Sequence, residues 1–297
     1  MSLSVRRVGH ESAEVVHHII REAFGNRPAL DPPADALLET VSSIATRLAL
    51  NGGLVARVDG EPVGTLLFDP VGDTVYLRRF GVLPAAQGHG VAAAMVDTAV
   101  EAWIGRARLT VVAREELPAN IAFWERRGFA QADRRTPYVE LSRPLPRLYD
   151  VPTADDMRAL GASIGADLRP GDLLVLSGGL GAGKTTFTQG LGEGLGVRGG
   201  VTSPTFVIAR VHPSLRGGPD LVHVDAYRLG GMAELDDLDL DTSLDQAVTV
   251  VEWGEGMAET LSDSRLEVRI SRSDEEAEGD LDPRHVEVVG IGTRWVS

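Results

Sequence analysis

The sequence predicts an α/β protein made of two domains. Its 297 residues exceed the roughly 100–200 that a single domain usually contains. Hydrophobic residues make up 43% of the chain, which is enough for a buried core in each half. Amphipathic helical patterns alternate with strand-like apolar runs along both halves. We therefore expect a mixed β-sheet with helices in the first domain and an α/β domain in the second.

The two halves differ in charge. Residues 1–146 contain 16 Arg against 17 Asp and Glu, whereas residues 147–297 contain 13 Arg and Lys against 26 Asp and Glu. A phosphate backbone would repel the acidic second half, so we expect no direct tight nucleic-acid binding by it. Protein partners, or a small anionic ligand held at a local site, fit this half better.

Missing residue types exclude several classes of protein. The chain has no cysteine, which excludes disulfide bonds, thiolate nucleophiles and zinc–thiolate sites. The first residues lack the apolar segment of a signal peptide, and no apolar run is long enough to span a bilayer. We expect a cytoplasmic protein without a membrane partner.

The first domain is predicted to cover residues 1–142. Apolar residues at helical spacing predict two early helices, and the Asp59-Gly60 dipeptide predicts a hairpin turn. The predicted elements are helices at 15–24 and about 34–48, strands at 54–60, 62–69 and 74–83, a helix near 88–103, a strand at 108–113 and a helix at 118–127, and the end of the domain is again strand-like.

The two prolines of SRPLPRLY predict a linker at 143–149, followed by a second domain at 150–297. A helix is predicted there at 157–168. The predicted strands are 172–177, 221–225, 248–252, 265–270 and 285–291. We expect the acidic segment 271–283, between the last two, to be a solvated loop.

The strand at 172–177 leads into a glycine-rich loop that contains the only lysine of the chain. The pattern is Gly178-x-x-x-x-Gly183-Lys184-Thr185, followed by helix-forming residues. Such glycines let backbone N–H groups point at phosphate oxygens, and the next helix adds its N-terminal positive potential. The lysine reaches the β- and γ-phosphates with a compact ammonium, and the threonine hydroxyl ligates Mg²⁺. The pattern predicts a P-loop NTPase-like domain that binds a nucleoside triphosphate.

Acidic residues end two of the later buried strands. Asp225 closes LVHVD, and Glu252 closes VTVVE. Open α/β sheets gather their ligands at the carboxyl ends of strands, so both acids should lie near the P-loop. One of them can hold Mg²⁺ while the other positions the attacking water, and the residues alone leave open which does which.

The nucleotide is predicted to be ATP. GTPases recognise guanine with an Asn-Lys-x-Asp loop, which a chain with a single lysine at position 184 cannot contain. A small-molecule kinase is the alternative, but we find no arginine-rich lid segment of the kind that such enzymes use.

Four stretches of this half stand out in order within about 150–270: LSGGLGAGKTTFTQGL, VTSPTFVI, HVDAYRL with ELDDLDL, and VVEWGE. Together they resemble the TsaE family, the small ATPases of bacterial tRNA N6-threonylcarbamoyladenosine synthesis. The resemblance implies that Thr185 and Glu252 bind Mg²⁺ and that Asp225 acts in hydrolysis. The catalytic residues that it implies are Lys184, Asp225 and Glu252. The ATP-binding residues that it implies are Gly178, Gly181, Ala182, Gly183, Lys184, Thr185, Thr186, Thr205 and Trp253.

The same resemblance implies a switch-like segment and protein partners. Ser203, Pro204 and Thr205 would lie near the γ-phosphate. The family resets a TsaB- and TsaD-like carbamoyltransferase pair with ATP, and the acidic charge of this half agrees with protein partners. The chain departs from the family at Gly179, where Asp is usual, so loop rigidity or hydrolysis rate should differ.

A second glycine-rich turn, PAAQGHG, follows a strand of the first domain and opens a helix. Backbone amides at such a helix N-terminus can approach a pyrophosphate closely. Together with PANIAFWERRGF downstream, the turn resembles the GNAT acetyltransferase family over about 1–142. The resemblance implies acetyl-CoA as the cofactor. The binding residues that it implies are Val82, Gln87, Gly88, His89, Gly90, Val91, Ala92 and Asn120.

The first domain departs from that family at Trp124. Tyrosine is frequent there and can protonate the leaving CoA thiolate, which an indole cannot do. Glu115 and Glu116 are candidate general bases, although loop acids are more often merely solvated. The sequence thus predicts an acetyltransferase-like domain fused to a tRNA-modification ATPase. The alternative is a small-molecule kinase preceded by a non-catalytic CoA-binding or interaction module.

Overall fold

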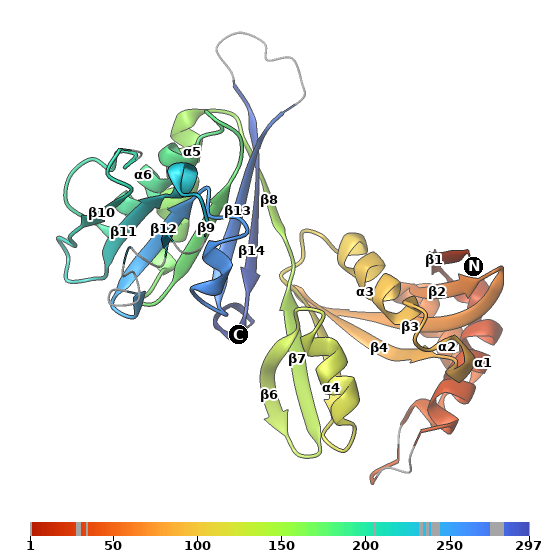
Figure 1. The fold of residues 1–297 in the computed structure, drawn as a ribbon. Helices are drawn as coiled ribbons and strands as arrows, with labels where there is room; N and C mark the ends of the chain where they lie inside the picture. Colours follow the sequence, from red (N-terminus) through yellow and green to blue (C-terminus); the bar gives the residue numbers. More distant parts are fainter. Residues whose placement is uncertain are drawn as a thin grey trace. The chain divides into compact units, whose positions relative to one another are not determined.

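The computed structural model describes residues 2–27, 31–33, 35–204, 206–231, 234–235, 238, 244–273 and 282–296. The chain divides into an N-terminal unit that ends at Leu145 and a C-terminal unit, Pro146–Trp295, and each contains a seven-stranded sheet (Figure 1). This confirms the predicted α/β fold class. Across the described residues, no helix combines the length and apolar character needed to cross a bilayer.

The N-terminal unit is a mixed sheet with the strand order β1-β2-β3-β4-β5-β7-β6. Its strands are β1 Leu3–Val8, β2 Gly53–Val58, β3 Glu61–Val71, β4 Thr74–Val82, β5 Arg108–Arg114, β6 Ala130–Arg135 and β7 Tyr138–Pro144. Among the described strands of this sheet, β4 and β5 are the only parallel neighbours. The predicted turn joins β2 to β3, with φ values of 50° at Asp59 and 91° at Gly60, as a two-residue hairpin turn requires.

β4 and β5 pair only where they begin. Residues 74–76 of β4 pair with 108–110 of β5, although the two strands continue to Val82 and Arg114. A bulge in β4 accompanies this separation, because its pairing with β3 shifts register and Arg79 adopts a φ of 54° there. The separation leaves an open edge on β4 beyond Tyr76, and this edge forms one side of a cleft.

Helices cover both faces of this sheet. They are α1 Ala13–Gly25, α2 Val41–Asn51, α3 Val91–Ala102 and α4 Pro118–Glu125. Consecutive strand residues point to opposite faces. Val55 therefore packs in the core with α1 and α2, whereas Leu54 and Ala56 pack in the core with α3.

The helix predicted at about 34–48 is in fact two elements. A short 3-10 helix, Asp35–Leu38, comes first, and α2 begins only at Val41. The Thr40 hydroxyl accepts a hydrogen bond from the N–H of Ser43, and the Ser43 hydroxyl accepts one from the N–H of Thr40. This reciprocal cap ends the preceding turn, while the apolar spacing used for the prediction continues through it.

The C-terminal unit has the strand order β10-β11-β12-β9-β13-β14-β8. Its strands are β8 Arg147–Val151, β9 Leu173–Ser177, β10 Ala209–His212, β11 Asp220–Asp225, β12 Ala247–Glu252, β13 Arg265–Arg272 and β14 Arg284–Ile291. β11, β12, β9 and β13 are parallel, and antiparallel strands flank them. The carboxyl ends of these four strands therefore meet at one edge.

β8 begins within the stretch expected to be a linker and continues to Val151. Pro144 ends β7 and Arg147 begins β8, so most of 143–149 is strand. β8 pairs with β14, far away in the sequence, and the prolines gave no sign of this. Most of the acidic loop predicted at 271–283 lies outside the described residues.

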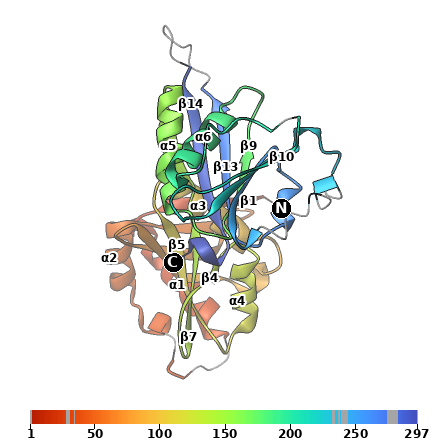
Figure 2. The same ribbon diagram turned by 90° about the vertical axis from the view of Figure 1, so that its left-hand side faces the viewer.

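Two helices, α5 Ala154–Asp167 and α6 Lys184–Leu195, lie side by side over one face of this sheet (Figure 2). Small residues allow the close approach, because a Cβ at Gly190 of α6 would lie 2.1 Å from the carbonyl oxygen of Arg158 in α5. α6 is thereby held firmly against α5. The opposite face packs against chain segments around Leu235 and Ala258.

Candidate functional site

The glycine-rich loop leads from β9 into α6, as the motif requires. Gly178 adopts a φ of 147°, and a Cβ on it would lie 2.3 Å from the carbonyl oxygen of Ile270 in β13. Gly183 precedes α6 with a φ of 109°. Glycine is required at position 178 both by the positive φ and by the close approach of the Ile270 carbonyl. The loop therefore lies against β13 and leads directly into the first residue of α6.

Lys184 is the first residue of α6, and its side chain folds back over the loop. Its Nζ donates to the carbonyl oxygens of Gly178 at 2.7 Å and Gly179 at 3.1 Å. The residue is 5% exposed, and Nζ lies 3.6 Å from the centroid of the Trp253 ring. Burial lowers the pKa of Lys184, and the carboxylates of Glu252 and Asp225 partly oppose this effect. The loop carbonyls and the indole thus solvate the ammonium.

Trp253 follows the last residue of β12 in an unusual backbone conformation. Its φ is 62°, in the left-handed region that a bulky residue rarely adopts. Its backbone N–H donates to the carbonyl oxygen of Leu176 at 3.0 Å, and the centroid of its ring lies 5.1 Å from that of the Tyr227 ring. The backbone turns here so that the indole faces the glycine-rich loop.

Thr185 and Glu252 lie next to each other. The Thr185 hydroxyl donates to the Glu252 carboxylate, with its Oγ1 3.1 Å from Oε1 and 3.2 Å from Oε2. Glu252 is 2% exposed, and His223 Nε2 lies 2.8 Å from its Oε1. The strand ends therefore bring this predicted pair together, with a histidine behind the carboxylate.

Asp225 ends β11, beside the end of β12. Ser203 donates its hydroxyl to Oδ2 at 2.9 Å, and the N–H of Tyr227 donates to Oδ1 at 3.1 Å. Thr205, the last of the three residues of the predicted switch-like segment, lies outside the described residues. Within the described part, the carboxylate is oriented by one hydroxyl and one backbone amide.

The donor atoms fit a magnesium ion that is bound mainly through phosphates. Thr185 and Glu252 offer hard oxygen ligands, which Mg²⁺ prefers. The residues that the structure describes contain no group of three or more His, Cys, Asp or Glu arranged to hold a metal. Mg²⁺ usually keeps several waters and uses one or two carboxylates plus substrate phosphates, so one carboxylate and one hydroxyl suffice.

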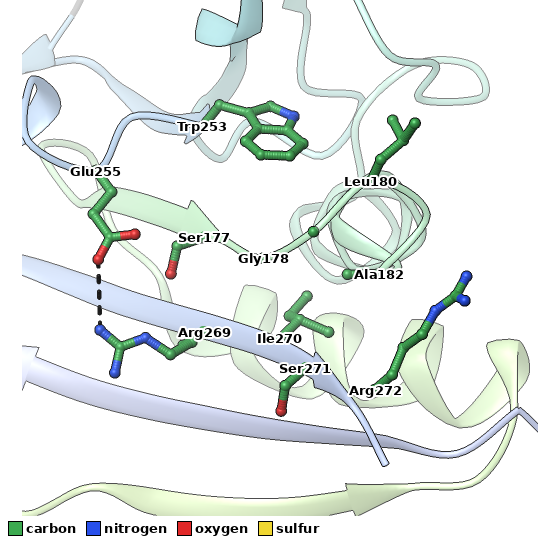
Figure 3. A pocket seen from close by; sticks show the side chains of 11 residues that line it. Ser177, Gly178, Leu180, Ala182, Trp253, Glu255, Arg269, Ile270, Ser271 and Arg272 are labelled. Atoms are coloured by element: carbon green, nitrogen blue, oxygen red, sulfur yellow. Dashed lines mark ion pairs between the residues drawn. The ribbon is translucent and has the colours of Figure 1, made fainter. Parts of the chain in front are cut away.

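A pocket of about 800 Å³ lies beside the loop (Figure 3). Three members of the predicted ATP-binding set line it: Gly178, Ala182 and Trp253. On its other side are residues of β13, among them Arg269, which forms an ion pair with Glu255 at 3.6 Å. The remaining described members of the predicted set form the loop and the first turn of α6 and do not line this pocket: Gly181, Gly183, Lys184, Thr185 and Thr186.

Two residues of this site were missed from the sequence. His223 supports Glu252, and Arg284 of β14 donates from Nε to the carbonyl oxygen of Ala182 at 3.0 Å. His223 stands two residues before Asp225, so strand alternation could have placed it on the same face. The position of Arg284 depends on a distant strand, and no local pattern indicates it.

The open edge of β4 lines a second pocket, of about 750 Å³, in the N-terminal unit. Four predicted CoA-binding residues line it: Val82, Gln87, Ala92 and Asn120. The other four, Gly88, His89, Gly90 and Val91, form the turn and the first residue of α3 and do not line the pocket. The carbonyl oxygen of Val82 accepts a hydrogen bond from Gln87 Nε2 at 3.2 Å.

Trp124 faces this pocket from within an aromatic cluster. It is 6% exposed, and its ring centroid lies 4.9 Å from Phe80, 5.1 Å from Phe123 and 5.0 Å from Phe129. The indole therefore serves as packing at this position. A proton donor would have to come from elsewhere in the pocket.

The two candidate general bases are held by arginines. A hydrogen bond from Arg134 lowers the pKa of Glu115, and one from Arg114 lowers the pKa of Glu116. A carboxylate with a lowered pKa binds a proton less well, so this environment does not favour either residue as a base.

Comparisons with known proteins match both halves. Residues 151–280 match the family model described as threonylcarbamoyl adenosine biosynthesis protein TsaE, and residues 14–129 match that of the acetyltransferase (GNAT) family. The tRNA threonylcarbamoyladenosine biosynthesis protein TsaE of Streptomyces coelicolor is 64% identical over 144 residues, which are 48% of this chain and 95% of that protein.

Solved structures were matched as well. Bacillus subtilis YdiB is 34% identical with a TM-score of 0.40, over 50% of this chain and 88% of that one. PaiA N-acetyltransferase of Thermoplasma acidophilum, in complex with coenzyme A, is 14% identical with a TM-score of 0.43, over 48% of this chain and 99% of that one.

Proposed function

The chain belongs to the TsaE family through its C-terminal half, and from this premise we propose that the C-terminal unit hydrolyses ATP in the synthesis of threonylcarbamoyladenosine in tRNA. The observation that carries the proposal is the cluster at the N-terminus of α6. There Lys184 covers the glycine-rich loop, and Thr185 contacts Glu252. Asp225 ends the neighbouring strand of the sheet.

Each residue of this cluster has a chemical task in the proposal. Lys184 exchanges the carbonyl oxygens of the loop for phosphate oxygens, which are stronger acceptors for an ammonium. Thr185 and Glu252 supply oxygen ligands for Mg²⁺, which neutralises charge on the phosphates when it is bound. Asp225 accepts a hydrogen bond from the attacking water and orients it.

We propose that the N-terminal unit binds acetyl-CoA along the open edge of β4 and transfers the acetyl group to an amine. The support is the cleft between β4 and β5, together with the turn that opens α3. Gly88 and Gly90 adopt φ values of 80° and 78°, and a Cβ on either would meet no atom within 4 Å. The turn is thus open on its outer side, as close approach by a pyrophosphate requires.

The proposed partners of the C-terminal unit are proteins similar to TsaB and TsaD, whose complex it would reset. The sequence of this half is acidic, which fits a protein partner better than bare tRNA. Hydrolysis by the isolated chain is expected to be slow, because partner contact can be needed to order a switch segment.

The decisive experiment measures ATP hydrolysis by the full chain alone and with a TsaB–TsaD pair. We expect stimulation by the pair and no phosphorylated metabolite. A phosphorylated small molecule without stimulation would instead support a kinase. As a second test, residues 147–297 are expected to restore growth of a strain that lacks its own TsaE.

A non-catalytic N-terminal module is a second candidate, because Trp124 is packed among aromatic rings and offers no acidic proton near neutral pH. Calorimetry with acetyl-CoA, followed by an amine acetylation screen, separates the two. Binding with turnover supports the transferase, and binding without turnover supports the module.

A further inference from the structure

One arginine in the cleft of the N-terminal unit has no acidic partner among the residues that the structure describes. Three of the four arginines that line the cleft are ion-paired: Arg78 with Asp69, Arg79 with Glu39, and Arg114 with Glu116. Arg27, the fourth, forms no ion pair with any residue that the structure describes. Positions 28–30 and 34, which are not described, are Pro, Ala, Leu and Ala and carry no acid.

Arg27 is half-buried against apolar groups. Its Nη2 donates to the carbonyl oxygen of Phe80 at 3.2 Å, and its Cζ lies 3.8 Å from the ring centroid of Phe24. Burial lowers the pKa of Arg27, and no neighbouring carboxylate opposes this effect. A guanidinium has five N–H donors, so the bond to Phe80 leaves most of its capacity for a ligand. A half-buried cation without a counter-charge is costly unless a ligand supplies one.

Arg27 reaches the open edge of β4 from the face opposite to the predicted CoA turn. It follows α1, which packs on one face of the sheet, whereas α3 packs on the other. Arg27 binds the carbonyl oxygen of Phe80, and Gln87, just before α3, binds that of Val82. Both carbonyls belong to β4, and Arg27 and Gln87 line the same pocket. A molecule that enters from the α1 face therefore meets Arg27 beside the CoA edge.

We infer that the acetyl acceptor of the N-terminal unit is a small amine that also carries a carboxylate, and that Arg27 binds this carboxylate. The inference rests on the acetyl transfer proposed above. A planar carboxylate can accept two parallel N–H bonds from a guanidinium, which fixes the direction of the amine as well as its affinity. Polyamines lack the carboxylate and add positive charge, so the pocket discriminates against them.

The reaction balances without any further reagent. The acceptor nitrogen forms a C–N bond with the acetyl carbon as the thioester C–S bond breaks. The nitrogen loses one proton and the thiolate gains one. Arg27 takes no part in this transfer. It is a positioning residue that binds the acceptor at a group remote from the reacting nitrogen.

The test uses the full chain and pairs of amines that differ only in the carboxylate. Free amino acids and the corresponding amino acid amides are compared by thiol release from acetyl-CoA. Arg27→Gln, Arg27→Lys and Arg6→Gln are the variants, and Arg6 is an exposed residue of β1 that serves as the control. Calorimetry measures the Kd for acetyl-CoA with each variant.

We expect kcat/KM to be about 10–100-fold higher for the acids than for the amides, because a charged hydrogen-bonded pair is lost in the amides. Arg27→Gln is expected to raise KM for the acids by a similar factor and to leave their kcat nearly unchanged. The kcat/KM for the amides and the Kd for acetyl-CoA should also stay nearly unchanged. Arg27→Lys should recover part of the loss, and Arg6→Gln should behave as wild type. Equal use of acids and amides would overturn the inference.

Two further outcomes are also decisive. If Arg27→Gln weakens acetyl-CoA binding, the anion belongs to the cofactor and the inference is wrong. If acetyl-CoA binds but no amine is acetylated, the proposed transferase function fails. The acceptor site is then decided by calorimetry on the complex with CoA. Amino acids that bind with an Arg27-dependent Kd support the site, and a lack of binding rejects it.

Discussion

His223 Nε2 lies 2.8 Å from Oε1 of Glu252, and both side chains are buried. Thr185 donates its hydroxyl to the same carboxylate. Glu252 is therefore held from two sides, by the first turn of α6 and by the neighbouring strand β11. The carboxylate is fixed before any ligand arrives, as an octahedral ion such as Mg²⁺ requires.

Replacing His223 should lower the affinity of the site for Mg²⁺ without abolishing nucleotide binding. His223→Leu removes the group behind Glu252, and we expect the half-saturating Mg²⁺ concentration for ATP hydrolysis to rise about 10–100-fold. His223→Gln keeps an N–H donor and should lose less. Magnesium titrations of hydrolysis measure this effect. Identical titration curves for His223→Leu and wild type would show that Glu252 needs no support.

Lys184→Ala should abolish ATP hydrolysis, with a loss of at least about 100-fold in kcat, because the phosphates lose their cation. Lys184→Arg should not restore it. Lys184 is 5% exposed, and its ammonium lies between two loop carbonyls and the Trp253 ring. A guanidinium is wider than an ammonium. Phosphate release is measured with Arg198→Ala, an exposed position, as the control. Full turnover by the arginine variant would contradict the proposed fit.

Gly190→Ala should destabilise the C-terminal unit, although alanine favours helices by about 1 kcal/mol over glycine. The added Cβ would lie 2.1 Å from the carbonyl oxygen of Arg158, so α5 and α6 must move apart at a cost of about 1–3 kcal/mol. Gly200→Ala, where a Cβ meets nothing within 4 Å, is the control. Urea unfolding of both variants measures the difference. A stabilised Gly190→Ala protein would mean that the helices are not in this close contact.

The stability of the C-terminal unit should fall in mild acid because of His212. Burial first, then the nearby His223 and Arg210, lower the pKa of His212 below its ordinary value of 6.5. The unfolded chain therefore binds a proton as the pH falls through 6.5, while the folded chain does so only at lower pH. Stability is retained above pH 6.5 and declines below it. The test measures urea unfolding midpoints of wild type and His212→Gln between about pH 7.5 and 5.5. The midpoint should decline less with falling pH in the variant.

Trp124→Tyr should increase acetyl transfer if the N-terminal unit is a transferase that lacks a good acid. A phenol in this position can protonate a thiolate, and a well-placed general acid contributes about 100-fold or more. Thiol release from acetyl-CoA measures the effect, with Trp124→Phe as the matched control. No gain, or an equal gain in both variants, would argue that the proton comes from another group.

The strand, loop and helix around Lys184 could be predicted because the glycine spacing and the buried strand are local properties of the chain. The contact of Thr185 with Glu252 followed from the rule that parallel strands end at one edge. The hydrogen bond between His223 and Glu252 could not be predicted from this rule alone. It depends on the register in which Asp225 lies opposite Glu252, and no single-sequence pattern gives a register.

The edge strands show the same limit. β1, β8 and β10 were not predicted, because each lies at an edge of its sheet and lacks the apolar run that marks the buried central strands. Arg284 could not be assigned to the glycine-rich loop either, since β14 reaches the loop only through its place in the sheet. The Thr40 cap was readable in principle, but continuous apolar spacing concealed it.

The two residues between β7 and β8 have a consequence for separating the halves by truncation. A fragment that starts at Asp150 would remove most of β8 and expose the backbone donors and acceptors of β14 that β8 now satisfies. Unpaired strand edges recruit other chains. Fragments cut there should oligomerise or precipitate, whereas those that start at or before Arg147 should stay monodisperse.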